Sequence, residues 1–161
     1  MKITVLIISY RSVEKLRNCI KSIGKNREII VVENSSLKEI KEQIEKEYNN
    51  CKVIMSNSNL GYAKAANLGF KHVKTDYALL LNTDIVINDH QINEIEKQSI
   101  IIGNSFTLAS PLSDDLVDFN QNNQIDKFFD NSANKFNSNE EISKIDLVKG
   151  CSLIVNLKKF H

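Results

Sequence analysis

The sequence of 161 residues has little cysteine, a single proline and no apolar run that approaches the length of a membrane span. Its three cysteines are odd in number and lack C-x-x-C spacing, which argues against a disulfide framework or a zinc site and fits a reducing compartment. The apolar start MKITVLIISY soon meets Arg11 and Glu14 without a small-residue cleavage site. We therefore expect a strand there rather than a signal peptide.

An excess of charge of one sign is also missing. The chain has 21 Lys and Arg against 20 Asp and Glu, a net charge of +1. This balance gives no electrostatic case for binding nucleic acid or an anionic membrane surface. Hydrophobic residues make up 42% and charged residues 25%, which is ordinary for a soluble globular domain. We expect a cytoplasmic protein, and the sequence leaves peripheral association with the inner face of a membrane open.

Short β-branched runs alternate with helical periods over the first hundred residues. The runs are short enough for strands buried on both faces. We predict strands at Ile3–Ser9, Glu28–Glu33, Lys52–Ser56 and Tyr77–Asn82.

Apolar residues at helical spacing predict a helix after each strand. The first contains Val13, Leu16, Ile20 and Ile23 and ends at Gly24, a natural C-cap. The second contains Leu37, Ile40 and Ile44 behind a capping-box spacing at Ser36–Glu39. The third is alanine-rich and follows Gly61, and the fourth contains Ile92, Ile95 and Ile102.

This alternation predicts an α/β fold with a mostly parallel central sheet, flanked by helices and joined by right-handed crossovers. We expect one domain over residues 1–161. Residues 1–110 form its first half, residues 111–145 are a polar variable segment, and residues 146–161 begin a second half with a strand. Gly150, in IDLVKGCSLIVNL, marks a bend or a point of close approach.

Polar residues stand where each predicted strand ends. In an open parallel sheet, ligands bind outside the carboxyl ends of the strands, near a switch in strand order. The four sets are Ser9-Tyr10-Arg11, Glu33-Asn34-Ser35, Asn57 to Gly61, and Asn82-Thr83-Asp84. If the sheet is as predicted, they converge on one crevice.

The residue types suit a nucleotide and its phosphates. Tyr10 offers an aromatic face to a base, and Glu33 with Asn34 offers hydrogen-bonding groups. Gly61 lets backbone approach a ligand closely, and the helix that follows it points its free N–H groups toward phosphate.

Lys64 and Asn67, three residues apart on that helix, share a face and could both reach a diphosphate. Asp84 is a hard oxygen ligand for Mg²⁺ or Mn²⁺. Each feature also has an ordinary structural interpretation. Asn82-Thr83-Asp84 alone is more often a turn that ends a strand, and a lone lysine is usually solvated. The coincidence of four polar sets on one rim favours a binding site.

The segments VLIISYRSVEKLRNCIKSI, IIVVENSS, NSNLGYAKAANLGFKHVKTDYALLLNTDIVI and VKGCSLIVNLKKF together resemble the family 2 glycosyltransferases with a GT-A fold. The likeness is greatest to the rhamnosyltransferase-like branch. It implies a dTDP- or UDP-sugar donor, a divalent cation, and inverting transfer of the sugar to a hydroxyl of a glycan or lipid-linked acceptor. The implied setting is synthesis of a bacterial surface polysaccharide.

The resemblance also implies roles for residues at matching motif positions. Ser9, Tyr10 and Glu33 would surround the nucleotide base and ribose. Gly61, Lys64 and Asn67 would line the diphosphate side. Asn82 and Asp84 would be the two ends of a D-x-D-like motif, with Asp84 bound to the metal. Gly150 would lie beside the sugar and acceptor.

The sequence departs from the family's usual pattern at three sites. Arg11 stands where the family usually has Asn, Glu33 where it has Asp, and N-T-D replaces N-P-D. The family's general base lies in a Glu-Asp segment downstream of KGCSLIVNLKKF, which this sequence does not contain. We therefore expect a donor-binding portion without a catalytic base.

Two other functions stay open at this level. A sugar-phosphate nucleotidyltransferase has a related layout, but it would carry a glycine- and basic-rich loop after the first strand, and SYRSVEK is not that loop. A non-catalytic nucleotide-sugar-binding module is favoured by the missing base.

Overall fold

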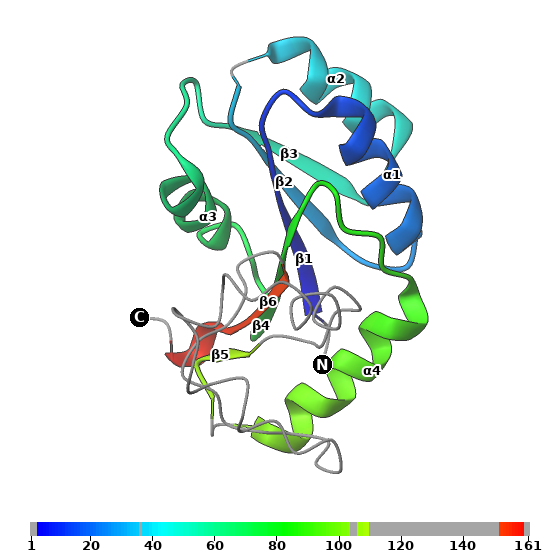
Figure 1. Cartoon of the computed structure of the whole chain (residues 1–161), viewed down its shortest axis with the longest axis vertical. Helices are drawn as coiled ribbons and strands as arrows, with labels where there is room; N and C mark the ends of the chain where they lie inside the picture. The colour runs from blue at the N-terminus through cyan, green and yellow to red at the C-terminus, as the bar shows by residue number, and fades with distance from the viewer. Residues whose placement is uncertain (1–2, 36, 104–105, 110–151, 160–161) are drawn as a thin grey trace, which may run out of the picture.

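A six-stranded sheet in the order β3-β2-β1-β4-β6-β5 forms the centre of the computed structural model, which describes residues 3–35, 37–103, 106–109 and 152–159 (Figure 1). The strands are β1 (Ile3–Ser9), β2 (Ile29–Glu33), β3 (Cys51–Met55), β4 (Tyr77–Asn82), β5 (Leu108–Ala109) and β6 (Ser152–Asn156). The helices are α1 (Val13–Ile23), α2 (Lys38–Glu47), α3 (Tyr62–Phe70), α4 (Asp89–Ile102) and a 3-10 turn at Leu157–Lys159. Among the described residues, no helix is both long and apolar enough to cross a membrane.

β1 to β4 run parallel, and their register brings their carboxyl ends to one edge of the sheet. Ser9 pairs with Glu33 of β2, and Ile8 pairs with Asn82 of β4. The chain moves outward from β1 to β2 and β3, then returns to β4 on the other side of β1. The strand order therefore reverses between β1 and β4. β6 is antiparallel to β4, so the sheet is mostly parallel, as predicted.

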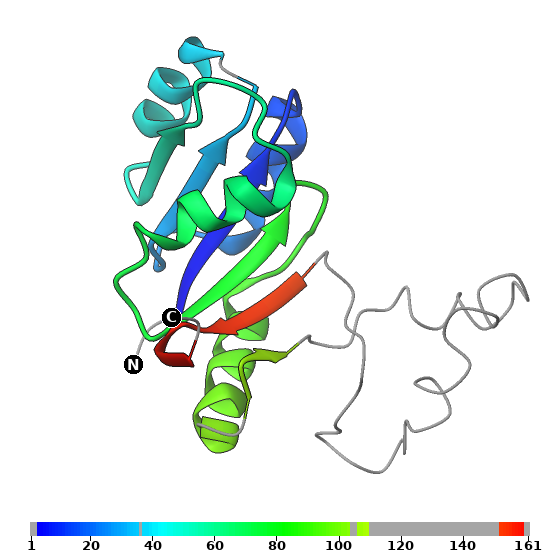
Figure 2. The same ribbon diagram turned by 90° about the vertical axis from the view of Figure 1, so that its left-hand side faces the viewer.

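Helices cover the sheet on both faces (Figure 2). Alternate strand residues such as Val5 and Ile7 form one core cluster with α1, α2 and α4. Leu6 and Ile8, which point the other way, form a second cluster with Ala65 and Ala66 of α3. Because both faces are covered, the strands need apolar residues at nearly every position, which accounts for their unbroken apolar runs.

The start of α2 differs from the sequence-based expectation. Leu37, in extended conformation with φ −82° and ψ 97°, is the N-cap of α2, and its side chain makes no capping hydrogen bond. Leu37 therefore lies before the helix and stays exposed instead of joining Ile40 and Ile44 in the core. The expected cap Ser36 lies outside the described residues. A reciprocal capping box is present instead at α4, between Asn88 and Gln91.

α3 lies very close to the sheet because its buried face carries Ala65, Ala66 and Gly69. A Cβ atom added to Gly69 would lie 2.9 Å from Cδ2 of Leu6 and 3.0 Å from Cγ2 of Val32. Those distances are shorter than van der Waals contact, so only glycine fits there without a shift. This close packing places the start of α3, at Gly61, next to the strand ends.

A buried arginine attaches α4 to the loop before β2. Arg27 is 8% exposed, and its guanidinium donates to Oδ1 of Asp89 at 2.9 Å, to Oε2 of Glu96 at 2.8 Å and to the side chain of Asn93. The hydrogen bond from Arg27 lowers the pKa of Asp89. The three acceptors lie along one face of α4, so this cluster sets the direction of that helix.

We predict that Gly69→Ala destabilises the fold by about 2 kcal/mol, because overpacking against Leu6 and Val32 outweighs the gain in helix propensity. Urea unfolding followed by circular dichroism measures this. Asn67→Ala, on the exposed face of α3, provides the matched control and should leave stability unchanged or slightly higher. Equal stability of Gly69→Ala and the parent would show that the helix can move outward freely.

We predict that Arg27→Ala lowers the free energy of unfolding at pH 7 by about 3 kcal/mol. This value is at the lower end of the range for breaking a buried ion pair, because the side chain of Asp89 is 35% exposed. Arg17→Ala breaks the exposed pair with Glu47 and should cost only about 0.5 kcal/mol.

The effect of Arg27→Ala also depends on pH. Since the folded-state pKa of Asp89 is lowered, its contribution is fully present above about pH 4 and disappears as pH falls through that lowered value. The stability difference between parent and Arg27→Ala should therefore shrink on acidification. Urea unfolding at a series of pH values tests this, and a difference that grows toward low pH would contradict it.

Candidate functional site

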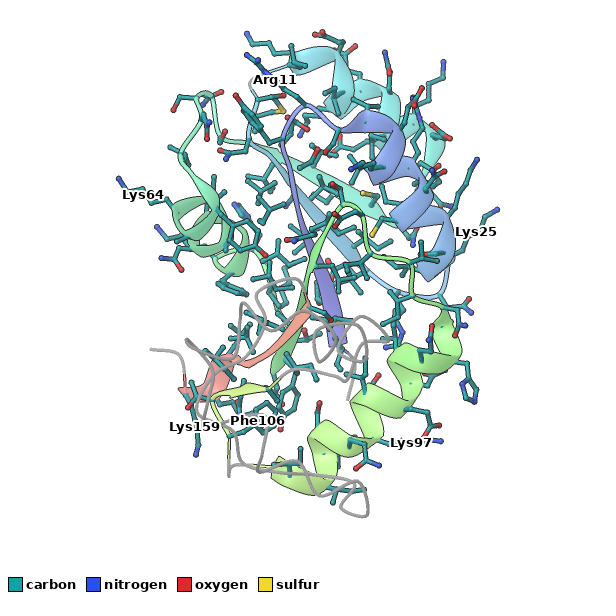
Figure 3. The ribbon with its side chains drawn as sticks, viewed as in Figure 1. Arg11, Lys25, Lys64, Lys97, Phe106 and Lys159 are labelled. Carbon is teal, nitrogen blue, oxygen red and sulfur yellow. The ribbon has the colours of Figure 1, made fainter. Side chains whose placement is uncertain are left out.

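A cleft of about 880 Å³ opens at the carboxyl ends of β1 and β4, where the strand order reverses. It is lined by the turn from Tyr10 to Lys15, by Asn34 and Asn59, by Gly61 and Tyr62, and by Asn82 to Asp84. All four polar sets identified in the sequence thus contribute to one concave surface. The volume suits a small-molecule ligand. Arg11 marks this edge of the sheet in Figure 3.

The predicted site residues fall into three groups. Tyr10, Gly61, Asn82 and Asp84 line the cleft. Ser9 and Glu33 do not line it and are fully buried at the ends of β1 and β2.

Lys64 and Asn67 are exposed on α3 and are not among the cleft residues. Figure 3 shows Lys64 pointing outward from the helix, away from the sheet. Their contact with a diphosphate remains a prediction. Gly150 lies outside the described residues.

Asp84 presents an exposed carboxylate directly after β4. Within the described part of the chain, it makes no hydrogen bond and no ion pair, and no group of three His, Cys, Asp or Glu residues is assembled to hold a metal. Mg²⁺ and Mn²⁺ often bind through one or two carboxylates together with phosphate oxygens of a ligand. An unpaired carboxylate in a cleft fits that mode of binding rather than an all-protein cage.

The thiol of Cys19 lies near the end of β4, where Asn82 and Asp84 stand. Its Sγ atom is 3.9 Å from the carbonyl oxygen of Asn82. Burial, and secondarily the charge of Asp84, raises the pKa of Cys19 to about 12. The group therefore stays a neutral thiol near neutral pH.

Ser9 and Glu33 occupy paired positions of β1 and β2 below the cleft. Oε1 of Glu33 accepts from the backbone N–H of Ser35 at 2.8 Å and from its hydroxyl. Among the described residues, Oε2 of Glu33 and Oγ of Ser9 have no hydrogen-bond partner although both are buried. Buried polar groups are normally paired, so these two atoms retain bonding capacity next to the cleft.

Asn34 is the residue of its set that reaches the cleft, a distinction from Glu33 that the sequence pattern does not make. Its Oδ1 accepts from the N–H of Leu60 at 2.9 Å, and its Nδ2 donates to Oδ1 of Asn59 at 3.1 Å. Oδ1 of Asn59 also accepts from the N–H of Gly61 at 2.9 Å. Asn34 therefore holds the loop that leads into α3.

Arg11, a member of the first polar set and a departure from the family pattern, lines the cleft in an unusual conformation. Its φ is +50°, and its Cζ atom lies 5.3 Å from the centroid of the Tyr10 ring. Positive φ is costly for most residues, whereas Asn tolerates it. This conformation gives a physical reason for the Asn usual at this position in the family.

Two helices begin at the cleft without a side-chain cap. Gly61, at φ +75°, is the N-cap of α3, and Ser12 is the N-cap of α1. The free N–H groups and the positive dipole ends of both helices lie beside the carboxylate of Asp84. An anionic ligand and a cation are the pair of groups that this combination of charges can bind together.

Comparison with known proteins identifies proteins of similar sequence. The sequence profile of "Glycosyl transferase family 2" matches residues 4–146. The low-salt glycan biosynthesis hexosyltransferase Agl10 of Haloferax volcanii is 27% identical over 113 residues, covering 68% of this chain and 36% of that protein.

Solved structures share the fold at lower identity. The glycosyltransferase GlyE of Streptococcus pneumoniae TIGR4 superimposes with a TM-score of 0.60 at 14% identity, covering 99% of this chain and 35% of that one. The mannosyltransferase PcManGT of Pyrobaculum calidifontis, in complex with GDP-Man and Mn²⁺, gives 0.58 at 14% identity, covering 74% and 37%. S. aureus TarS in complex with UDP-GlcNAc gives 0.51 at 22% identity, covering 63% and 32%.

The chain spans about a third of the length of each of these proteins. The GT-A-like α/β fold expected from the sequence is confirmed. Because the family profile matches most of its length, the chain belongs to glycosyl transferase family 2.

Proposed function

We propose that this chain binds the nucleotide-sugar donor of an inverting glycosyltransferase, with a divalent cation held by Asp84. The observation that carries the proposal is the exposed, unpaired Asp84 carboxylate in a cleft where two helices begin. The relatives support it, since PcManGT was solved with GDP-Man and Mn²⁺ and TarS with UDP-GlcNAc. The product we propose is a surface polysaccharide or another glycan, made on the cytoplasmic side from a glycan or lipid-linked acceptor.

The resemblance to the rhamnosyltransferase-like branch makes a dTDP- or UDP-sugar the first donor to test. Tyr10 offers its ring to the base, and Asn82 lies where it can contact the ribose. Gly61 brings the N–H groups of α3 to the diphosphate. When bound, Mg²⁺ or Mn²⁺ supplies positive charge that stabilises the departing nucleoside diphosphate.

Sugar transfer by in-line displacement also requires removal of a proton from the acceptor hydroxyl. Motif position assigns that role to none of the described residues. We therefore assign to these residues the binding and orientation of the donor. Asp84 fixes the phosphate end of the donor through the cation, and Tyr10 fixes its base end.

The stack of Arg11 on Tyr10 bears on how the base is held. Arg11 covers the ring while its own backbone has positive φ. A cation over an exposed aromatic face contributes about 0.5–1 kcal/mol, close to the cost of the backbone conformation. We propose that the contact with Tyr10 offsets the cost of positive φ at Arg11, a conformation that Asn adopts more readily. The same contact keeps the ring of Tyr10 oriented for the base.

We predict that Asp84→Asn lowers the Mn²⁺-dependent affinity for UDP and dTDP at least about 10-fold, since the amide keeps the shape but loses the charge that holds the cation. Isothermal titration calorimetry with and without EDTA separates the metal-dependent part. Glu14→Gln removes another exposed carboxylate from the same cleft and should retain the metal dependence. Equal losses in both variants would point to general negative potential instead of a ligand at Asp84.

We predict that Arg11→Asn is more stable than Arg11→Ala by about 1 kcal/mol, because both remove the contact with Tyr10 but only Asn tolerates positive φ. Urea unfolding of the two variants side by side measures the difference. Arg11→Gly provides a second check, since glycine adopts positive φ freely but loses more backbone entropy on folding. Indistinguishable stabilities of the Asn and Ala variants would show that the backbone at position 11 is not strained.

A further inference from the structure

Two hydroxyl groups connect the segments on either side of the cleft. Oγ of Ser12, in the turn between β1 and α1, lies 3.1 Å from Oγ1 of Thr83, which follows β4. The residues are 71 positions apart in sequence, and both line the cleft. Thr83 immediately precedes Asp84, so the contact joins the segment that carries the proposed metal ligand to the start of α1.

The Ser12 hydroxyl makes this contact in place of its usual local one. Ser12 is the N-cap of α1, where serine normally accepts a hydrogen bond from a backbone N–H of the first turn. Its side chain makes no such bond here. The hydroxyl is therefore directed across the cleft to Thr83 rather than back to its own helix.

Asp84 lies between two attachments of its segment to α1. On one side is the Ser12–Thr83 contact, and on the other the N–H of Ile87 donates to Oγ of Ser22 at 3.1 Å. The turn itself is closed only by a long hydrogen bond of 3.3 Å from the N–H of Ile85 to the carbonyl of Asn82. Since no hydrogen bond or ion pair of the Asp84 side chain is present within the described residues, these attachments hold the backbone that carries its carboxylate.

We propose that Thr83, through its hydroxyl contact with Ser12, is a positioning residue that sets the Asp84 carboxylate for cation and diphosphate binding. This inference rests on the proposed function of Asp84. A hydrogen bond between two hydroxyl groups contributes little to the free energy of unfolding of the whole chain. The same small free energy is enough to restrict the conformations of a short exposed turn. Orientation of a ligand by supporting hydrogen bonds commonly changes metal affinity by a factor of about 10 or more.

The test compares Thr83→Val, which keeps the shape and removes the hydroxyl, with Thr83→Ser, which keeps the hydroxyl. Thr83→Val and Ser12→Ala should each lower the Mn²⁺-dependent affinity for UDP about 10-fold, and the double variant should lose no more than either single one. Thr83→Ser should restore parental affinity. UDP binding in EDTA should be the same in all of them.

Thr75→Val is the matched control. Oγ1 of Thr75 is 2.9 Å from Oγ1 of Thr4, a second hydroxyl pair that joins β1 to the chain beside β4, at the opposite end of the same strands. Its loss should lower stability and leave metal-dependent binding unchanged. Comparable loss of metal-dependent affinity in Thr75→Val and Thr83→Val would overturn the inference, as would failure of Thr83→Ser to restore it.

A second measurement does not depend on the metal. Amide hydrogen exchange of Ile85 in the metal-free chain should be faster in Thr83→Val than in the parent, while exchange of Leu79 in the middle of β4 stays the same. Unchanged exchange at Ile85 would overturn the positioning role. If Thr83→Val speeds exchange at Ile85 but the parent chain shows no metal-dependent UDP binding, the result would instead overturn the proposed function of Asp84.

Discussion

The central position of β1 is the constraint on which the cleft depends. β1 pairs in parallel with β2 on one side and with β4 on the other, and its residues are buried on both faces. The chain first moves away from β1 in one direction and later returns to the opposite side. Because crossovers between parallel strands are right-handed, that reversal places α3 on the face opposite α1 and α2. The loop after β3 therefore leaves the sheet edge toward the opposite face from the loops after β1 and β4, and a concave edge lies between them.

The packing of α3 turns this topology into a defined site. A helix that stood farther from the sheet would carry its first N–H groups away from the strand ends. Ala65, Ala66 and Gly69 allow it to lie directly on Leu6 and Val32. At the other end, Asn34 and Asn59 hold the loop before Gly61 through side-chain hydrogen bonds. Close packing and loop anchoring together set where the helix dipole meets the cleft.

The main elements could be predicted from sequence because their signals are local and strong. The runs Ile3–Ser9 and Tyr77–Asn82 coincide with β1 and β4, since strands buried on both faces must be apolar throughout. β5 has two residues and forms only through pairing with β6, so it leaves no pattern of its own. The start of α2 at Leu37, without a capping side chain, depends likewise on context outside the helix.

The site was predictable at the level of the rim but not of every side chain. In a strand that is apolar on both faces, sequence does not reveal which residues turn toward which face, so Glu33 could not be recognised as buried while Asn34 reaches the cleft. The exposed positions of Lys64 and Asn67 could be predicted from the sequence. With Ala65, Ala66 and Gly69 as the buried stripe, helical phase places both on the outer face.

Burial gives different roles to two carboxylates at the same sheet edge, Asp84 and Glu33. Glu33 is fully enclosed and already bonded on one oxygen to Ser35, so it is held by the protein. Asp84 is exposed and unpaired among the described residues, so its charge is available. Under the proposed function, a diphosphate in this cleft would stand near a like charge, and two like charges at about 4 Å repel by several kcal/mol unless water or a counter-ion screens them. A divalent cation held by Asp84 would offset that repulsion. Dependence on metal would then follow from the placement of the Asp84 carboxylate.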